Sequence, residues 1–455
     1  MADLPLLLHH PHALAGSRYA PPRMQEALLA RLQLERTLAH NAGCVTVLCA
    51  PPGSGKTTLL HQHYQRLRAQ HAGVRWLTLS PEDNDPQRLQ QHLAIALLSH
   101  ADAPLCNSAL PADLHAFIDG LELLTHPPAL ELLLQLLLHL PADASVYTTA
   151  HQLLHPSLHD ARLRGVLRVM DAQQLRLSHV EAATLLGAQW PPELAMQLNL
   201  RMQGWIAGVR LLQHSPHTAQ QWLADTHGRR LVPTALADYF ESVLCQAMRP
   251  QLLQTLMELS TLERFRSELY AALPSPPCAW SEMEQLLQSG WFLQQLPESP
   301  AWLQVHPALG QYLRQRLQRH APERYWALRQ FAAQWHAEQG YGKEAVRHAV
   351  QLGTPQATLI MEQAGAIAID LGEGLDVMLE QPLPPERAAE LPLVYLGQIY
   401  HRFRQGRVQE ARQMFDAAQA HTQHFTRIHN PLLQDEVRGW HCLLHLVMLL
   451  SLIHI

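Results

Sequence analysis

The chain has 455 residues, of which 47% are hydrophobic and 16% are charged, and its formal net charge is −5. This composition excludes global disorder, and the length is typical of about three domains. The small negative charge excludes an overall basic surface for DNA, the six cysteines form no CxxC pair, and no apolar stretch is long enough to span a bilayer, so we expect a cytoplasmic protein with no membrane partner.

Strand and helix patterns alternate through the first third of the chain. The strands are short apolar runs rich in β-branched residues, whereas the helices repeat apolar residues at helical spacing. The expected strands are residues 44–50, 74–79, 114–118 and 145–149. The expected helices are residues 57–70, 86–99 and 130–140. This alternation predicts an α/β domain with a parallel sheet.

A candidate phosphate-binding loop follows the first expected strand. Residues 50–57 read Ala-Pro-Pro-Gly-Ser-Gly-Lys-Thr, which is a P-loop with Ala in place of the first Gly. Glycines let the backbone N–H groups turn toward phosphates, the Lys neutralises their charge, and the Thr hydroxyl coordinates Mg²⁺. The expected nucleotide-binding residues are Pro52, Gly53, Ser54, Gly55, Lys56, Thr57 and Thr58. A chance Gly/Pro-rich turn is the alternative, but the position between strand and helix favours a site for ATP or ADP.

Asp119, at the end of the 114–118 strand, is the expected second Mg²⁺ ligand beside Thr57. A lone Asp is also common where an ordinary strand meets a loop. A second acid next to it would activate water, but Gly120 follows and Glu122 lies two residues further on. We therefore expect slow ATP hydrolysis at most, and no firm catalytic residue.

After about residue 172 the patterns are mostly helical, with one clear strand expected at 302–305. From Ala321 onward, helices are expected in pairs joined by Gly-containing turns. The pairs are residues 325–339 with 343–352, and 393–404 with 407–420. Paired helices of this size predict a solenoid of the TPR type.

The 30 histidines include two groups, one at His9, His10 and His12 and the other at His155 and His159. Neither group has the carboxylate of an HExxH motif, so we expect no metal site besides that for Mg²⁺.

Taken together, several segments resemble the MalT-like, large ATP-binding regulators of the LuxR type, within the STAND class of signalling ATPases. The matching segments, in order, are residues 18–23, 50–57, 76–79, 83–86, 114–119, 175–182, 204–208, 290–293, 305–307, 312–314 and 335–349. The resemblance implies an ATP/ADP-controlled switch. The implied fold is an α/β P-loop NTPase domain followed by an all-α helical domain, a winged-helix domain and the start of a TPR-like α-solenoid. The implied divisions are a leader (1–40), the P-loop nucleotide-binding domain (41–171), the helical domain (172–232), the winged-helix domain (233–320) and an incomplete helical sensor arm (321–455).

The resemblance also implies roles for single residues. His306, which precedes Pro307, would touch the nucleotide phosphates, and Trp205 and Gly208 would pack the helical domain against the nucleotide-binding domain. Two departures from the family pattern argue against efficient hydrolysis and γ-phosphate sensing. Gly120 stands where the family has a second acid, and Ala150-His151 stands where it has an Arg after the strand.

Members of this family are signal-responsive transcriptional regulators. They bind a small-molecule or protein inducer, self-associate on activation and contact DNA through a LuxR-type helix-turn-helix. That domain is absent from this sequence, and residues 450–455 stop within an expected helix without a cap. We therefore expect a fragment that reaches DNA only through a missing C-terminal domain. The alternatives are a P-loop ATPase, or a nucleotide-binding scaffold that recruits proteins through its helical arm without DNA.

Overall fold

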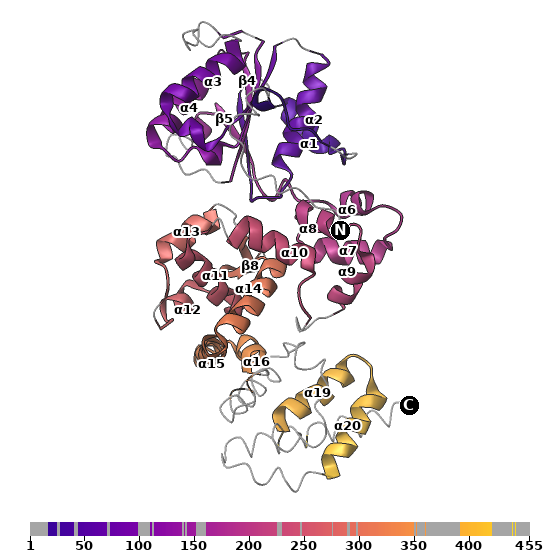
Figure 1. Cartoon of the computed structure of the whole chain (residues 1–455). Coiled ribbons are helices and arrows are strands. Elements are labelled where there is room, and N and C mark those ends of the chain that lie inside the picture. The colour runs from indigo at the N-terminus through magenta and orange to yellow at the C-terminus, as the bar shows by residue number, and fades with distance from the viewer. Residues whose placement is uncertain are drawn as a thin grey trace, which may run out of the picture. The chain divides into compact units, whose positions relative to one another are not determined.

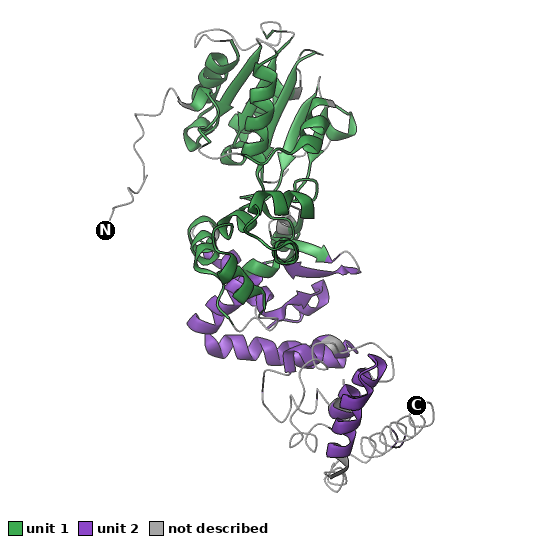
Figure 2. Cartoon of the chain, turned by 90° about the vertical axis from the view of Figure 1, so that its right-hand side faces the viewer, with its two compact units in different colours: residues 1–248, 279–295, 306–309 green, residues 249–278, 296–305, 310–455 purple. Residues whose placement is uncertain are grey.

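The structure is a computed structural model that describes residues 17–24, 28–40, 44–70, 73–98, 110–111, 113–138, 141, 143–151, 161–224, 230–245, 248–274, 276–288, 292–296, 299–349, 352, 360, 392–420, 439 and 442. The two histidine groups (9, 10, 12 and 155, 159), Gly290, Trp291 and residues 450–455 lie outside this set. The chain forms two compact units (Figure 2). The first comprises residues 1–248, 279–295 and 306–309, and the second comprises residues 249–278, 296–305 and 310–455.

The first unit contains a five-stranded sheet. Its strands are β1 (Val45–Cys49), β2 (Val74–Thr78), β3 (His115–Asp119), β4 (Ser145–Ala150) and β5 (Leu167–Met170). The order across the sheet is β2-β3-β4-β1-β5, and each neighbouring pair runs parallel. Because all strands run the same way, their carboxyl ends meet at one edge, where loops from β1, β3 and β4 lie next to each other.

Helices cover both faces of this sheet. The helical segments of this part are η1 (Ser17–Tyr19), α1 (Leu32–His40), α2 (Lys56–Arg68), η2 (Pro81–Asn84), α3 (Pro86–Leu98), η4 (Leu121–Leu123) and α4 (Pro127–Leu138). Figure 1 shows α3 and α4 on one face and α1 and α2 on the other.

The alternation of side chains along each strand explains this three-layer arrangement. In β3, Ala116 and Ile118 belong to the core under α3 and α4, whereas Phe117 between them belongs to the core under α1 and α2. In β1, Val47 and Leu48 divide between the two cores in the same way. Strands buried on both faces carry mostly apolar or β-branched residues, which is why their pattern was readable in the sequence.

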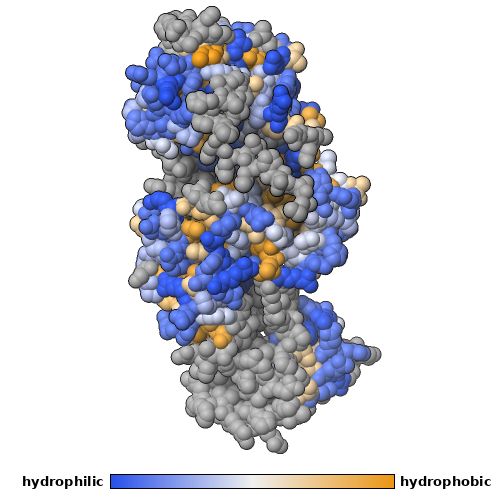
Figure 3. Space-filling model, in the orientation of Figure 1, coloured by the Kyte–Doolittle hydropathy of each residue, from blue (hydrophilic) through white to orange (hydrophobic). Residues whose placement is uncertain are grey.

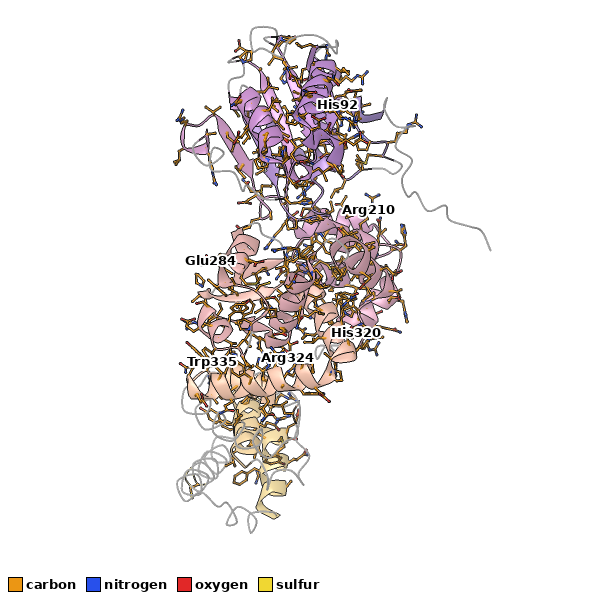
Figure 4. The ribbon with its side chains drawn as sticks, turned by 60° about the vertical axis from the view of Figure 1, so that its left-hand side comes forward. His92, Arg210, Glu284, His320, Arg324 and Trp335 are labelled. Carbon is orange, nitrogen blue, oxygen red and sulfur yellow. The ribbon has the colours of Figure 1, made fainter. Side chains whose placement is uncertain are left out.

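Polar contacts fix the start of the described chain to the part that contains the five-stranded sheet. Arg18 donates to Ser80 Oγ at 2.6 Å and to Asp83 Oδ2 at 3.3 Å. His92, labelled in Figure 4, places Nδ1 2.5 Å from Asp83 Oδ1. Asp83 is fully buried, so these partners compensate a charge that would otherwise be costly to bury.

Short helices follow β5. They are α6 (His179–Leu186), α7 (Pro192–Arg201), α8 (Ile206–Leu211), α9 (Pro216–Leu223), α10 (Thr234–Tyr239) and the π-helical segment η5 (Phe240–Cys245). Local sequence sets several starts: Ser178 and Glu181 form a capping box at α6, and prolines occupy the first turns of α7 and α9.

The remaining elements run from Pro250 to Ala420. They are α11 (Pro250–Leu262), β6 (Arg264–Phe265), α12 (Ser267–Ala271), α13 (Trp280–Gln288), β7 (Leu293–Leu296), β8 (Ser299–Val305), α14 (Pro307–His320), α15 (Pro322–Glu338), α16 (Gly342–Ala349), α19 (Pro392–Arg404) and α20 (Val408–Ala420). Strand β6 pairs antiparallel with β8. Helices α15 and α16 pack as a pair, as do α19 and α20, in the layout expected of a TPR-like solenoid.

Charged side chains gather where α11 ends in the second unit. Glu263 follows α11 with φ 62° and ψ −70°, and its Oε1 lies 2.9 Å from an Arg329 NH2 group. Arg314 donates to the carbonyl of Ser260 at 3.0 Å, and Arg347 Nε lies 3.9 Å from Glu263 Oε2.

A second ion pair lies beside this cluster. Arg324, labelled in Figure 4, pairs with the buried Glu258 at 2.8 Å. Both arginines that bind these carboxylates, Arg324 and Arg329, belong to α15, so α15 is held to the end of α11 by charge as well as by packing.

The surface carries no long apolar helix among the residues that are described. On the face shown in Figure 3, hydrophobic residues are scattered between hydrophilic ones where atoms are coloured. Within the described ranges, no helix combines the length and apolar character that crossing a membrane requires.

Several elements differ from those expected. Strand β5 was not expected because it has only four residues and includes Arg168. Strand β6 has two residues and β7 contains two glutamines, so neither has a readable apolar pattern. Asp119 is the last residue of β3 itself, and α4 begins at Pro127, three residues before the expected helix start.

Candidate nucleotide-binding site

The loop between β1 and α2 has the backbone of a phosphate-binding site. Gly53 and Gly55 both adopt left-handed conformations, with φ of 75° and 82°. L-residues with a side chain rarely adopt such angles, so these glycines allow the loop to curl around a ligand. Helix α2 begins at Lys56, and the first amides of a helix have no partner within it. Their N–H groups, together with the positive end of the helix dipole, favour an anion at this position.

Lys56 is buried within this loop, with 7% of the residue exposed. Its Nζ donates to the carbonyl of Ala50 at 2.7 Å and to that of Pro51 at 3.1 Å. Burial lowers the pKa of Lys56, and the charges of Glu122 and Asp119 oppose that shift. The ammonium group therefore lies at the carboxyl edge of the sheet, beside two acids.

Thr57 and Asp119 are brought together as the sequence predicts. The Thr57 hydroxyl donates to Asp119 Oδ1 at 3.0 Å, and the Thr149 hydroxyl donates to the same oxygen at 2.7 Å. Two adjacent ligands of an octahedral Mg²⁺ with bonds of about 2.1 Å are about 3 Å apart. The spacing between the Thr57 and Asp119 oxygens therefore fits that ion.

Thr149 is a site residue that the sequence analysis missed. Its hydroxyl also accepts the backbone N–H of Gly120 at 2.8 Å, so it fixes both the Asp119 side chain and the turn after it. Thr149 ends the expected 145–149 strand, and this position was the one available indication of a role. That this strand lies next to the Asp119 strand becomes known only with the fold.

The helical part of the first unit contacts the loop directly. Trp205 Nε1 donates to the carbonyl of Pro52 at 3.0 Å, and the backbone N–H of Ala207 donates to that of Gly53 at 3.0 Å. A Cβ added to Gly53 would lie 2.6 Å from Ala207 Cβ and 2.9 Å from the Tyr239 hydroxyl. The loop is therefore closely packed against the start of α8.

Trp205 contacts the P-loop as expected, whereas Gly208 leaves space for the Trp205 ring. A Cβ at Gly208 would lie 2.4 Å from the Trp205 ring, so glycine makes room for the indole. The other side of the ring system meets Phe240, Phe292 and His306, with centroid distances of 5.7, 5.4 and 5.8 Å.

His306 lies next to the Trp205 ring. Its Nε2 is 2.9 Å from the carbonyl of Met202, and its Nδ1 is buried without a hydrogen-bond partner among the described residues. Burial lowers the pKa of His306 to about 4, although the bond to Met202 opposes the shift, so the imidazole is neutral at neutral pH. A contact between His306 and phosphate stays a prediction.

The other expected loop residues fall around the same turn. Ser54 donates its backbone N–H to the Pro51 carbonyl at 3.4 Å, and Thr58 belongs to the first turn of α2. No group of three or more potential metal-binding His, Cys, Asp or Glu residues occurs in the part of the chain that is described, so Thr57 and Asp119 remain the candidate pair for Mg²⁺.

A family model for the MalT winged helix domain matches residues 240–325, which run from η5 into α15. Whole-protein relatives extend the likeness beyond this domain. The HTH-type transcriptional regulator MalT of Cronobacter sakazakii is 26% identical over 357 residues, which is 70% of this chain and 39% of that protein. The chain is MalT-like.

Two other relatives widen the comparison. MalT of Serratia proteamaculans is 25% identical over 434 residues, covering 88% of this MalT-like chain and 47% of that protein. The serine/threonine-protein kinase PknK of Mycobacterium tuberculosis is 26% identical over 381 residues, covering 76% of the chain and 34% of the kinase. The chain thus spans less than half the length of each of these relatives.

Among solved structures, a STAND protein with a tetratricopeptide repeat sensor from Pyrococcus horikoshii covers 92% of the MalT-like chain and 68% of its own. Its sequence identity is 14% and its TM-score is 0.31.

Proposed function

We propose that this chain is the nucleotide-controlled switch of a signal-responsive transcriptional regulator. ATP or ADP would bind with Mg²⁺ at the loop between β1 and α2. The observation that best supports this is the joint placement of Lys56, Thr57 and Asp119 at the end of that loop. Together they have the chemistry that binding of a triphosphate with its metal requires.

Each of these residues would have its own role in binding the nucleotide. Backbone N–H groups of Gly53 to Thr58 would hold the phosphates, and Pro52 and Ser54 shape the turn that presents them. Lys56 would leave its two carbonyl partners to neutralise phosphate charge. Thr57 and Asp119 would hold Mg²⁺, which supplies further neutralisation of the phosphate oxygens.

A switch is favoured over rapid turnover by the contacts of the loop. Trp205 donates a hydrogen bond to the Pro52 carbonyl, and its ring contacts His306. A nucleotide-dependent movement of the loop would therefore shift both the Trp205 ring and His306. In one state of this switch His306 would exchange its bond to the Met202 carbonyl for one to phosphate. Gly120 places no acid beside Asp119, which is consistent with slow hydrolysis.

The regulatory role is inferred from the MalT relatives, which are named HTH-type transcriptional regulators. The helical arm from residue 321 would bind a small-molecule or protein inducer, and activation would include self-association. DNA would be contacted through a helix-turn-helix domain outside this sequence, and the protein would act in the cytoplasm.

The relationship to a protein kinase favours a second candidate function. Because PknK matches 76% of this chain, the same region occurs beside an effector that is not named for DNA binding. The second candidate is therefore a nucleotide-binding scaffold that recruits proteins through the helical arm.

Nucleotide binding and turnover test the proposal. We expect the wild-type chain to bind ATP with Mg²⁺ tightly and to hydrolyse it more slowly than about 1 per second, an ordinary enzyme rate. Lys56→Ala should abolish binding, because the remaining amides lack a compensating cation. Equilibrium titration with a fluorescent ATP analogue measures this.

The matched control is Arg66→Ala, which removes a half-exposed cation from the same helix. It should bind nucleotide as the wild type does. No binding by the wild type at millimolar nucleotide would refute the proposed function, and turnover well above 1 per second would favour an ATPase.

A further inference from the structure

Two titratable residues beside the P-loop have no part in the binding scheme above. Glu122 lies in η4, directly after β3, and His151 directly follows β4. Both therefore lie at the carboxyl edge of the sheet, where β4 is the neighbour of β1 and the Ala50 N–H donates to the Ala150 carbonyl at 3.1 Å. His151 Nε2 is 3.2 Å from Glu122 Oε1.

Backbone geometry brings Glu122 back to this edge. Gly120 has φ 94°, a left-handed conformation that turns the chain immediately after Asp119. Its N–H donates to the Thr149 hydroxyl at 2.8 Å, which holds the start of this turn. The Glu122 carboxylate, three residues beyond Asp119, thereby stays within the same group of side chains.

One carboxylate oxygen of Glu122 has no hydrogen bond among the described residues. Oε2 is buried and has no hydrogen-bond partner among the described residues, whereas Oε1 faces His151. A buried, unpartnered carboxylate oxygen costs free energy, and a pair that served stability alone would satisfy both oxygens. An acceptor that is held in place and still available is what a proton-accepting group needs.

The charges that act on the pair come from every neighbouring element. Lys56 of α2, Asp119 of β3 and the Cys49 thiol of β1 are all coupled to Glu122. Burial raises the pKa of Glu122, and burial together with Lys56 lowers the pKa of His151 to about 4. At neutral pH a neutral imidazole with its proton on Nε2 donates to Oε1. A carboxylate whose pKa is raised toward neutrality is also a stronger base.

We propose that Glu122 is the general base for nucleoside triphosphate hydrolysis at this P-loop, replacing the acid absent at Gly120, and that His151 is its positioning residue. As a water oxygen bonds to the terminal phosphorus, the bond from that phosphorus to the bridging oxygen breaks. One water proton passes to Glu122 Oε2, and the products are nucleoside diphosphate and phosphate. This inference rests on the proposed function, since it requires a bound triphosphate.

Glu122→Gln in the full chain tests the role of the carboxylate. Single-turnover hydrolysis of ATP should slow by about 100-fold, because a positioned base contributes 10²–10⁴-fold. Removing a negative charge near the terminal phosphate should also strengthen binding of a non-hydrolysable triphosphate analogue relative to ADP. The ratio of these two affinities is a readout that does not depend on turnover.

Two variants of His151 test positioning. His151→Ala removes the hydrogen bond that favours the charged carboxylate, so the pKa of Glu122 rises further. The acidic limb of the pH–rate profile should therefore move to higher pH. His151→Gln keeps a donor of similar reach and should restore most of the wild-type profile. Glu131→Gln, which alters an exposed carboxylate on α4, is the matched control and should change none of these readouts.

The outcomes separate this inference from the proposed function. If the wild type binds no nucleotide, the proposed function fails. If binding is intact but Glu122→Gln hydrolyses at the wild-type rate, or leaves the affinity ratio unchanged, the base assignment is wrong. Wild-type protein that binds ATP and shows no hydrolysis in a single turnover also overturns it.

Discussion

At Gly53, both the backbone and the surrounding side chains restrict which residue can be accommodated. Its φ is 75°, and an added Cβ would lie 2.6 Å from Ala207 Cβ and 2.8 Å from Trp205 Nε1. Gly165 has almost the same conformation, with φ 76°, but nothing lies within 4 Å of its added Cβ. Comparing the two sites separates backbone strain from steric overlap.

We expect Gly53→Ala to lower the free energy of unfolding by about 1–3 kcal/mol more than Gly165→Ala does. Both variants incur the cost of a left-handed alanine, but only the first adds overpacking. Urea denaturation of the two variants measures the difference. Equal losses would contradict close packing of α8 on the loop.

At the scale of elements, the contact between α8 and the P-loop depends on one indole N–H. Trp205→Phe keeps an aromatic ring among its neighbours and removes the bond to the Pro52 carbonyl. If this bond holds the loop in its nucleotide-retaining form, labelled ADP should dissociate several-fold faster from the variant, which stopped-flow fluorescence measures. Trp222→Phe, in α9 of the same part, should leave the dissociation rate unchanged.

A second junction of elements joins the end of α11 to α14, α15 and α16 through Glu263. Burial raises the pKa of this carboxyl, but Arg314, Arg329, His348 and Arg347 together lower it to about 2. Because the folded pKa lies below the value of about 4.3 expected when unfolded, the stabilisation is complete above that value and is lost as pH falls toward 2.

Glu263→Gln should therefore lower the free energy of unfolding at pH 7 by about 3 kcal/mol, since it leaves buried arginines without their counter-charge. It should also flatten the fall in melting temperature between about pH 4 and pH 2. Thermal melts across that range measure both effects. Glu338→Gln, which alters an exposed acid on α15, should keep the wild-type slope.

These contacts also show which structural features could be predicted from the sequence. The strands and helices around the P-loop were predictable because each carries its own apolar period, and Asp119 because it ends such a strand. Thr149 was missed, and Trp205 and His151 were named only through the family resemblance, not from a pattern of their own. Their positions depend on which strands are neighbours and on where α8 docks, and no local pattern encodes that.

At the scale of the whole molecule, the likeness to MalT and to PknK identifies a shared part. Both relatives match at least 70% of this chain while the chain covers less than 40% of either. Because these two relatives carry different names, the shared part is not tied to a single named activity.

Arg31 has a practical consequence for anyone who wishes to truncate the protein. It precedes the P-loop, yet its guanidinium donates to the carbonyls of Leu175 and Arg176 at 2.7 Å each and to Glu181 at 3.0 Å. A fragment that ends at residue 171 would keep the buried Arg31 without its hydrogen-bond partners. A fragment that begins at residue 41 would lack Arg31. A fragment of this part that is meant to fold by itself should therefore retain both Arg31 and α6.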